Sequence, residues 1–207
     1  VDVFDGIMDF EVYYDYHCPF VYRASMLLDS VRESGQRSLG VRWRYFSLTQ
    51  VNSRHNGWTV WGAPESELVR GRLAFKAAEA ARRQDRFDVF HQALLKARHL
   101  DRLDIDDIAV VEQVAVESGV DLERFRADIA SPSITEALAS DHQHAVATHG
   151  VFGTPTFVFS NGSIAYVRLS EAPTGADAVR VFDSLLAVAA HEPGILEIKR
   201  PAKPPAA

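Results

Sequence analysis

The amino-acid sequence predicts an α/β domain that is interrupted by an all-helical insertion. A strand–helix–strand unit occupies roughly the first fifty residues, where alternating apolar positions flank a segment of helical periodicity. Helical periodicity then continues for about eighty residues, and two short strand patterns and an amphipathic helix follow it. A chain of 207 residues is long enough for one large domain, or for a small domain with a substantial insertion.

The first segment predicts two parallel strands joined by a helix. Residues 7–14 alternate and are rich in strand-forming side chains, which indicates a central strand. A helix is expected from Pro19, where the missing N–H costs nothing, and Gly35 suits the position after its last turn. Its apolar face comprises Phe20, Ala24, Leu27, Leu28 and Val31. Residues 41–48 alternate again, so the unit is predicted to be a right-handed βαβ crossover.

The middle of the chain predicts a loop over residues 49–63 and then five helices. The first helix is expected to begin at Pro64 and to end near Arg82-Arg83, where basic residues suit a helix C-terminus. The second carries the apolar positions Phe87, Phe90, Leu94 and Ala97. The third is expected from Asp104 to Gly119, with Ile105, Ile108, Val111 and Val114 facing inward. Asp121 is predicted to cap the fourth, and Ser133 with Glu136 to form a capping box for the fifth.

The last quarter returns to strands. Residues 156–160 and 164–169 flank Asn161-Gly162, a pair that favours a tight hairpin turn. Residues 174–190 form an amphipathic helix, and the Pro-, Ala- and Lys-rich end from Lys199 is predicted to be disordered.

Without the helical block, the order of elements is that of the thioredoxin core. We therefore predict a thioredoxin-like fold with its core over residues 1–63 and 150–195. The insertion covers residues 64–149, and residues 196–207 are a tail.

Composition limits the classes of partner and the compartment. The net charge of −6 argues against nucleic acid or anionic membranes as partners. No apolar run reaches the ~20 residues of a membrane span. No secretory leader pattern stands at the start, and a single cysteine excludes an internal disulfide, so we expect a reducing, cytoplasmic setting.

Cys18 is the main candidate for chemistry. A single cysteine is more often a small buried apolar residue than a nucleophile. Cys18, however, lies at a predicted junction between strand and helix, where free backbone N–H groups and the helix dipole stabilise a thiolate. Because the thiolate is the reactive form of the thiol, this position favours a nucleophile.

Two segments resemble the DsbA-like oxidoreductases, especially the FrnE-type branch. Asp15-Tyr16-His17-Cys18-Pro19-Phe20-Val21-Tyr22 is similar to the signature Asp-x-x-Cys-Pro-x-x-Tyr/Trp of that family. Residues 151–158, Val-Phe-Gly-Thr-Pro-Thr-Phe-Val, resemble the segment that holds its cis-proline. The resemblance covers Met8 to Ala190, including the helical insertion.

The resemblance implies a cis Thr154–Pro155 bond beside Cys18. Local sequence by itself equally allows a trans proline at the start of a strand. With a cis bond, the backbone of Thr154 would be presented to an extended substrate or thiol beside the sulfur. On this basis Pro19, Thr154 and Pro155 are predicted to bind substrate.

One departure from the family matters for the mechanism. Val21 stands where these oxidoreductases carry a resolving cysteine, so the chain alone cannot store two electrons as an internal disulfide. Cys18 could form a mixed disulfide as a monothiol reductase or transferase. It could instead activate a bound thiol without a covalent bond, as the serine does in the similar kappa-class glutathione transferases and 2-hydroxychromene-2-carboxylate isomerases. The third alternative is a redox-inactive binding module.

The expected co-substrate is a small thiol or disulfide, with no tightly bound cofactor. Glutathione is one candidate, but the glutathione-using relatives carry a Gly-x-Asp-Arg segment after the last strand. Residues 168–171, Arg-Leu-Ser-Glu, lack that pattern, so another low-molecular-weight thiol is equally open. A homodimer is one option for the assembly, and the sequence does not decide it.

Several other side chains have both a functional and a structural interpretation. His17 could support the thiolate or relay a proton, or could be an exposed loop residue. Asp15 and Tyr22 are assigned structural roles, as the end of the strand and as packing on the helix.

Trp58 and Trp61 could form an apolar wall for a substrate, although a role in plugging the seam between core and insertion is favoured. His142, His144 and His149 lack thiolate or carboxylate ligands at suitable spacing, so no metal site is expected.

Overall fold

The computed structural model describes residues 7–200 of the chain. Its secondary structure runs in the order β1 (Ile7–Tyr14), α1 (Pro19–Glu33), β2 (Ser38–Tyr45), α2 (Leu48–Val51), α3 (Arg72–Arg82), α4 (Phe87–His99), α5 (Ile108–Glu117), α6 (Leu122–Ile129), α7 (Pro132–His149), β3 (Thr156–Phe159), β4 (Ile164–Tyr166) and α8 (Gly175–His191). The predicted α/β fold with an all-helical insertion is confirmed. The predicted tail comprises residues 196–207: residues 196–200 form neither helix nor strand, and residues 201–207 lie outside the described residues.

The four strands form one mixed sheet in the order β2-β1-β3-β4. β1 pairs in parallel with β2, as the predicted crossover requires, and β3 pairs antiparallel with both β1 and β4. β1 therefore has a partner on each side, which confirms the predicted central strand. A short turn joins its C-terminal end to Cys18, so α1 begins beside the C-terminal end of an inner strand.

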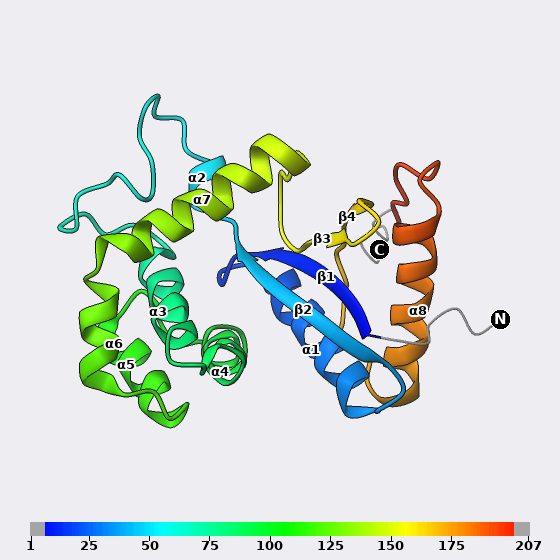
Figure 1. Cartoon of the computed structure of the whole chain (residues 1–207), viewed down its shortest axis with the longest axis horizontal. Helices are drawn as coiled ribbons and strands as arrows, with labels where there is room; N and C mark the ends of the chain where they lie inside the picture. Colours follow the sequence, from blue (N-terminus) through cyan, green and yellow to red (C-terminus); the bar gives the residue numbers. More distant parts are fainter. Residues whose placement is uncertain (1–6, 201–207) are drawn as a thin grey trace, which may run out of the picture.

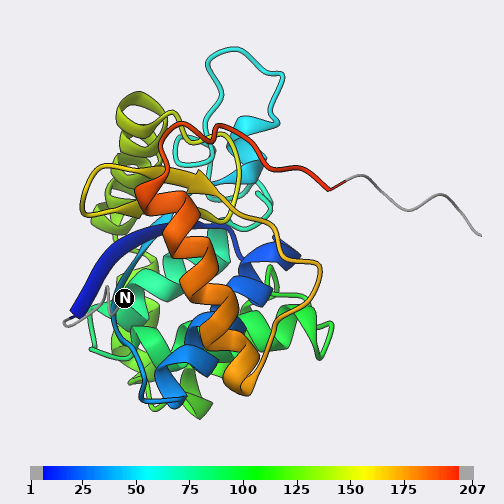
Figure 2. The same cartoon turned by 90° about the vertical axis from the view of Figure 1, so that its right-hand side faces the viewer.

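One face of the sheet is covered by α1 and α8, which pack against each other (Figures 1 and 2). Phe10 points to this face, where its ring lies 6.2 Å from that of Phe182 on α8. On the opposite face, α7 packs against β2, and Tyr13 of β1 meets His149 of α7 at a ring distance of 5.9 Å. Alternate residues of β1 thus serve two separate apolar layers, as expected for a strand covered on both sides.

The insertion packs as a group of helices beside the sheet, with α3 to α6 gathered at the left of Figure 1 and α7 crossing back toward β3. A buried aromatic cluster joins it to the sheet. Tyr14 lies 4.8 Å from the His91 ring and 5.8 Å from the Phe75 ring, so the end of β1 packs directly on α4 and α3. Core and insertion therefore share one continuous apolar core, which includes Cys18.

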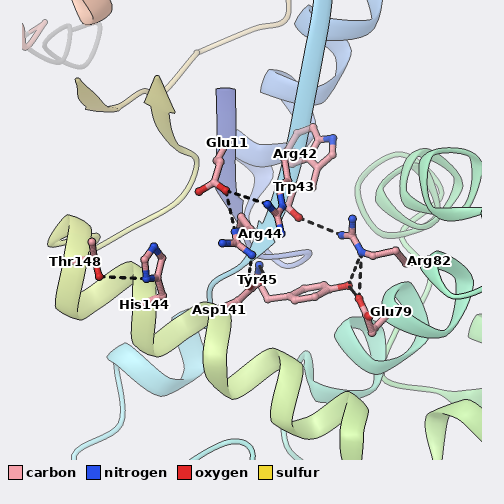
Figure 3. Close-up of polar contacts among 10 residues, drawn as sticks. All are labelled: Glu11, Arg42, Trp43, Arg44, Tyr45, Glu79, Arg82, Asp141, His144 and Thr148. Atoms are coloured by element: carbon pink, nitrogen blue, oxygen red, sulfur yellow. Dashed lines mark hydrogen bonds and ion pairs between the residues drawn. The ribbon is translucent and has the colours of Figure 1, made fainter. Parts of the chain in front are cut away.

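Figure 3 shows a second connection, in which polar groups join β2 to α3 and α7. Arg44 lies between Glu11 on β1 (3.2 Å) and Asp141 on α7 (2.7 Å). The Tyr45 hydroxyl donates to Glu79 on α3 at 2.7 Å. Because these groups are largely shielded from water, loss of one partner would leave a costly unpaired group.

The predicted helix from Pro64 is wrong over residues 64–71, which form turns before α3 begins. The reason is Arg72, whose buried guanidinium binds the carbonyl groups of the preceding residues in place of helical N–H groups. It donates to the carbonyl groups of Ala63 (2.8 Å), Pro64 (3.0 Å) and Glu67 (2.7 Å), which are thereby drawn toward one side chain. The sequence pattern also missed the short helix α2.

Two other helix starts differ from the prediction. Ser131, not Ser133, occupies the N-cap position of α7, so the predicted capping box is wrong. The Ser133 hydroxyl instead accepts from Arg83 at 2.8 Å. α5 begins at Ile108 after the N-cap Asp107, and Ile108 is 46% exposed rather than inward. Asp121 caps α6 as predicted, with its side chain accepting from the Arg124 N–H.

None of the helices within residues 7–200 is both long enough and apolar enough to cross a membrane.

Candidate active site

Cys18 is the N-cap residue of α1, with extended backbone angles, and Pro19 begins the helix. Its N–H donates to the Asp15 carbonyl at 3.0 Å, which closes the turn after β1. Its own carbonyl accepts from Val21 N–H at 3.1 Å, the first bond of the helix. The sequence order of strand, tight turn and proline thus brings the sulfur to a helix start, as predicted.

The Cys18 thiol donates to the Thr154 carbonyl at 3.2 Å, across 136 positions of the sequence. The Thr154–Pro155 bond is cis. Cys18 is 5% exposed and belongs to the main apolar core, whereas Pro19 beside it is exposed. The thiol is therefore shielded but lies next to solvent-exposed chain.

The segment before β3 is held rigidly against this sulfur. Thr156 Oγ1 donates to the Gly153 carbonyl at 2.8 Å, and the Val167 N–H donates to the Pro155 carbonyl at 3.1 Å. A Cβ on Gly153 would come within 3.1 Å of the Tyr166 ring, so the loop approaches β4 closely and a larger residue there would push this ring aside. Backbone groups, rather than side chains, therefore define this side of the site.

Val21 lies one helical turn after Cys18 and is fully buried in the main core. It occupies the position that a resolving cysteine would need. Cys18 is the only cysteine of the chain, and it carries a free thiol.

Asp15 shapes the turn between β1 and Cys18. One carboxylate oxygen accepts from the His17 N–H and the other from the Leu48 N–H, both at 2.8 Å. Burial raises the pKa of Asp15 above its ordinary value, although both hydrogen bonds act in the opposite direction. The structural role assigned to Asp15 agrees with these contacts.

His17 is not an exposed loop residue, because its side chain is only 9% exposed. Nε2 lies 3.1 Å from Oδ2 of Asp106, which precedes α5 in the insertion. The other oxygen of Asp106 accepts from the Gly71 N–H at 2.7 Å. Burial by itself would raise the pKa of Asp106, but the contacts with His17 and Gly71 outweigh it and hold the pKa below its ordinary value.

A histidine of the insertion, His99 at the end of α4, supports the same turn. His99 Nε2 lies 2.8 Å from the Tyr16 carbonyl, and its ring stacks on Tyr22 at 5.4 Å. Burial lowers the pKa of His99, which keeps the ring neutral and able to donate to that carbonyl. Tyr22 thus packs against the insertion, in line with its assigned structural role.

The two tryptophans of the long loop have different partners. The Trp58 indole N–H donates to Glu67 at 3.2 Å, and the Trp61 ring lies 5.1 Å from that of His142 on α7. The cavity beside Trp61 measures about 10 Å³, which is room for at most one water. Trp61 therefore closes the seam between the loop and α7, whereas Trp58 stays within the loop and the turns before α3. A wider groove of about 540 Å³ lies beside Asp9, at the end of β1 remote from Cys18.

The histidines of α7 have structural contacts. His142 Nδ1 accepts from the Ser47 N–H at 3.1 Å, and burial lowers its pKa to about 4. His144 contacts Thr148 at 3.2 Å, as Figure 3 shows. Within the part of the chain that the structure describes, no group of three or more potential metal ligands comes together.

Fold and site together define a thioredoxin-fold protein with one cysteine at the start of the helix after the central strand. A comparison with protein families matches residues 10–187 to the DSBA-like thioredoxin domain. The chain belongs to this family. A comparison with curated protein sequences finds no match.

Solved structures of similar fold include three proteins from bacteria. A probable DsbA oxidoreductase from Streptomyces coelicolor is 19% identical with a TM-score of 0.64, over 95% of this chain and 93% of that one. The cytosolic disulfide reductase DsbM from Pseudomonas aeruginosa, in a structure with GSH, is 19% identical with a TM-score of 0.61, over 86% and 99%. Reduced DsbA1 from Neisseria meningitidis is 17% identical with a TM-score of 0.54, over 94% and 90%. At these identities the likeness establishes the fold.

Sequence analysis did not find Asp106, Gly71 or His99, which surround the segment before Cys18. Gly71 falls inside the helix predicted from Pro64, and a glycine in a helix interior is a weak signal that the helix begins later. Asp106 carried none, because it lies 89 positions after His17 in a segment with several other aspartates.

Proposed function

We propose that this protein is a thiol–disulfide oxidoreductase that acts through Cys18 alone. The observation that carries the proposal is the position of the sulfur, at the N-cap of α1 and 3.2 Å from the backbone of Thr154. A thiol at a helix start is suited to become a thiolate, and the adjacent backbone is suited to align an extended substrate. Membership of the DSBA-like family supports the same class of chemistry.

The proposed reaction is thiol–disulfide exchange in two steps. The Cys18 thiolate attacks one sulfur of a substrate disulfide, which forms a mixed disulfide and releases the other sulfur as a thiolate that takes up a proton. A second thiol then loses its proton and attacks the mixed disulfide. This step restores the Cys18 thiolate and forms a new disulfide between the second thiol and the substrate fragment. Overall, two electrons pass from the second thiol to the sulfur that leaves as a free thiol. One thiol and one disulfide are consumed and one of each is formed, so no internal partner cysteine is needed.

In this proposal Thr154, Pro155 and Pro19 bind the substrate through the rigid backbone around the sulfur. His17 modulates the thiol. Trp58 and Trp61 are not assigned to the site, because their contacts are with Glu67 and His142.

We propose a low-molecular-weight thiol, such as glutathione, as the second thiol. The Pseudomonas aeruginosa protein of similar fold is a cytosolic disulfide reductase, and its structure was solved with GSH. A reducing compartment rich in small thiols would supply the co-substrate that a single-cysteine protein requires.

The test combines reactivity with intact mass. Wild-type protein and the Cys18→Ser variant are incubated with oxidised glutathione and analysed by intact mass. In separate samples without glutathione, the rate of alkylation by iodoacetamide is measured against pH. Binding of reduced glutathione is measured in a third set of samples. We expect one glutathionyl adduct on the wild type, released by excess thiol, and none on Cys18→Ser. Binding of reduced glutathione without an adduct would favour a thiol-dependent isomerase or transferase. A slowly alkylated Cys18 with neither adduct nor binding would contradict the proposal and favour a binding module.

A further inference from the structure

His17, the residue directly before the proposed nucleophile, is tied to the helical insertion by an acidic side chain. Nε2 lies 3.1 Å from Asp106 Oδ2, at ion-pair distance but without full hydrogen-bond alignment. The two side chains are only 9% and 14% exposed, so water screens their attraction weakly. Asp106 is itself held in place, because its other oxygen accepts from the Gly71 N–H at 2.7 Å.

This contact determines which ring nitrogen of His17 carries a proton. A carboxylate oxygen and an unprotonated ring nitrogen would repel each other at 3.1 Å, because both present lone pairs. Nε2 is therefore protonated, and the neutral ring has its free lone pair on Nδ1.

The packing around the ring leaves Nδ1 on the opposite edge. A Cβ on Gly71 would lie 3.3 Å from Cδ2 and 3.8 Å from Nε2 of His17, so this edge of the ring faces the start of α3. Nδ1 is buried and has no hydrogen-bond partner among the described residues. A buried acceptor without a partner is costly, and a role in catalysis is one of the explanations for such a group.

We propose that Asp106 is a positioning residue for the thiol chemistry of Cys18: by holding the proton on Nε2 of His17, it leaves Nδ1 free to accept the Cys18 proton, directly or through one water. The inference rests on the proposed function. In this step the proton leaves the sulfur and joins Nδ1, so the thiol becomes a thiolate, the ring becomes an imidazolium paired with Asp106, and no electrons are transferred. The insertion thus contributes to the reactivity of a cysteine that belongs to the core.

Two further titratable groups interact with His17: Asp15 accepts from the His17 N–H, and the His99 ring acts on His17 from α4. Arg70 acts on the two carboxylates that contact His17, Asp15 and Asp106. None of these groups is changed by a substitution at Asp106.

Asp106→Asn tests the inference with almost no change of shape. The new amide oxygen can still accept from the Gly71 N–H, but the amide nitrogen can only donate to Nε2, which forces the proton of the neutral ring onto Nδ1. We expect the ring ¹⁵N chemical shifts of His17, identified by their absence in His17→Gln, to change from the Nε2–H to the Nδ1–H tautomer. The alkylation rate of Cys18 near neutral pH is expected to fall by about tenfold or more, because Nδ1 can no longer accept a proton.

The matched control is Asp101→Asn, which makes the same charge change on an exposed residue of the same segment. It should leave both the tautomer and the alkylation rate as in the wild type. An unchanged His17 tautomer in Asp106→Asn would overturn the inference, whatever the reactivity of Cys18. A changed tautomer with an unchanged alkylation rate would overturn the positioning role and leave the proposed function intact. A wild-type Cys18 that forms no adduct and reacts slowly would instead overturn the proposed function, together with this role.

Discussion

The two sides of the site are built from different parts of the molecule and by different kinds of contact. On the core side, Cys18 meets the backbone of Thr154, and further backbone bonds hold that segment against β4. On the insertion side, the Asp106 carboxylate meets His17 and the His99 ring meets the Tyr16 carbonyl, so the insertion contributes side chains. Backbone contacts persist through most substitutions, whereas side-chain contacts can be altered one residue at a time. The comparison suggests that the core supplies the common chemistry of the fold and the insertion adjusts it.

Val21→Cys should produce the largest effect, because it changes the chemistry available to the core side. Positions 18 and 21 lie on one turn at the start of α1, so mild oxidation should join them in an internal disulfide. The bond would be measured by intact mass as the loss of two hydrogen atoms and by the loss of reactive thiols. If no bond forms, the geometry assigned to the start of α1 is wrong.

Gly71→Ala should disturb the insertion side specifically. Gly71 has φ +82°, and its Cβ would press on the His17 ring at 3.3 Å. We expect a loss of about 1–2 kcal/mol in the free energy of unfolding from the positive φ, and Cys18 alkylation slowed several-fold because the His17 ring must move.

Gly57→Ala is the control for this substitution. Gly57 has nearly the same φ, +79°, but a Cβ there would meet nothing within 4 Å. It should therefore lose similar stability by urea denaturation without any change in Cys18 alkylation. Equal alkylation rates in the two variants would show that the Gly71–His17 contact does not affect the thiol.

Asp15→Asn should alter the pH dependence of stability. Because burial raises the pKa of Asp15, the folded protein binds this proton more tightly than the unfolded chain does. The contribution of Asp15 to the free energy of unfolding is therefore full at low pH and declines as the pH rises from about 4 to the raised value, by at most about 1.4 kcal/mol per pH unit.

Urea denaturation from about pH 4 to about pH 7 would measure this decline, which Asp15→Asn should remove. The exposed Asp101→Asn variant should retain the wild-type slope. A slope in Asp15→Asn equal to that of the wild type would contradict the raised pKa.

Trp61→Ala should have the smallest effect on the site. Its ring packs on His142, away from the groups that contact Cys18, and it is partly buried in a small apolar cluster. We expect a loss of about 1–3 kcal/mol in stability and an alkylation rate of Cys18 within about twofold of the wild type. A large fall in the alkylation rate would instead show that Trp61 contributes to the site, as part of an apolar wall for the substrate.

Local sequence patterns predicted the elements whose interactions are themselves local. The strand from Ile7, the helix from Pro19 and the Asp121 cap depend on neighbours within a few positions, and all three are confirmed. The helix predicted from Pro64 failed because Arg72 draws the preceding carbonyl groups to its own side chain. A pattern of residue types cannot show that one buried arginine competes with a helix.

Chain order and helix geometry are enough to place a lone cysteine between a strand and a helix that begins with proline. The groups that surround this cysteine depend instead on tertiary packing. Thr154 reaches the sulfur and Asp106 reaches His17 from positions far along the chain, and such meetings depend on how the sheet and the insertion pack. Burial of these groups, which sets the strength of their electrostatic contacts, is likewise a property of the packed molecule.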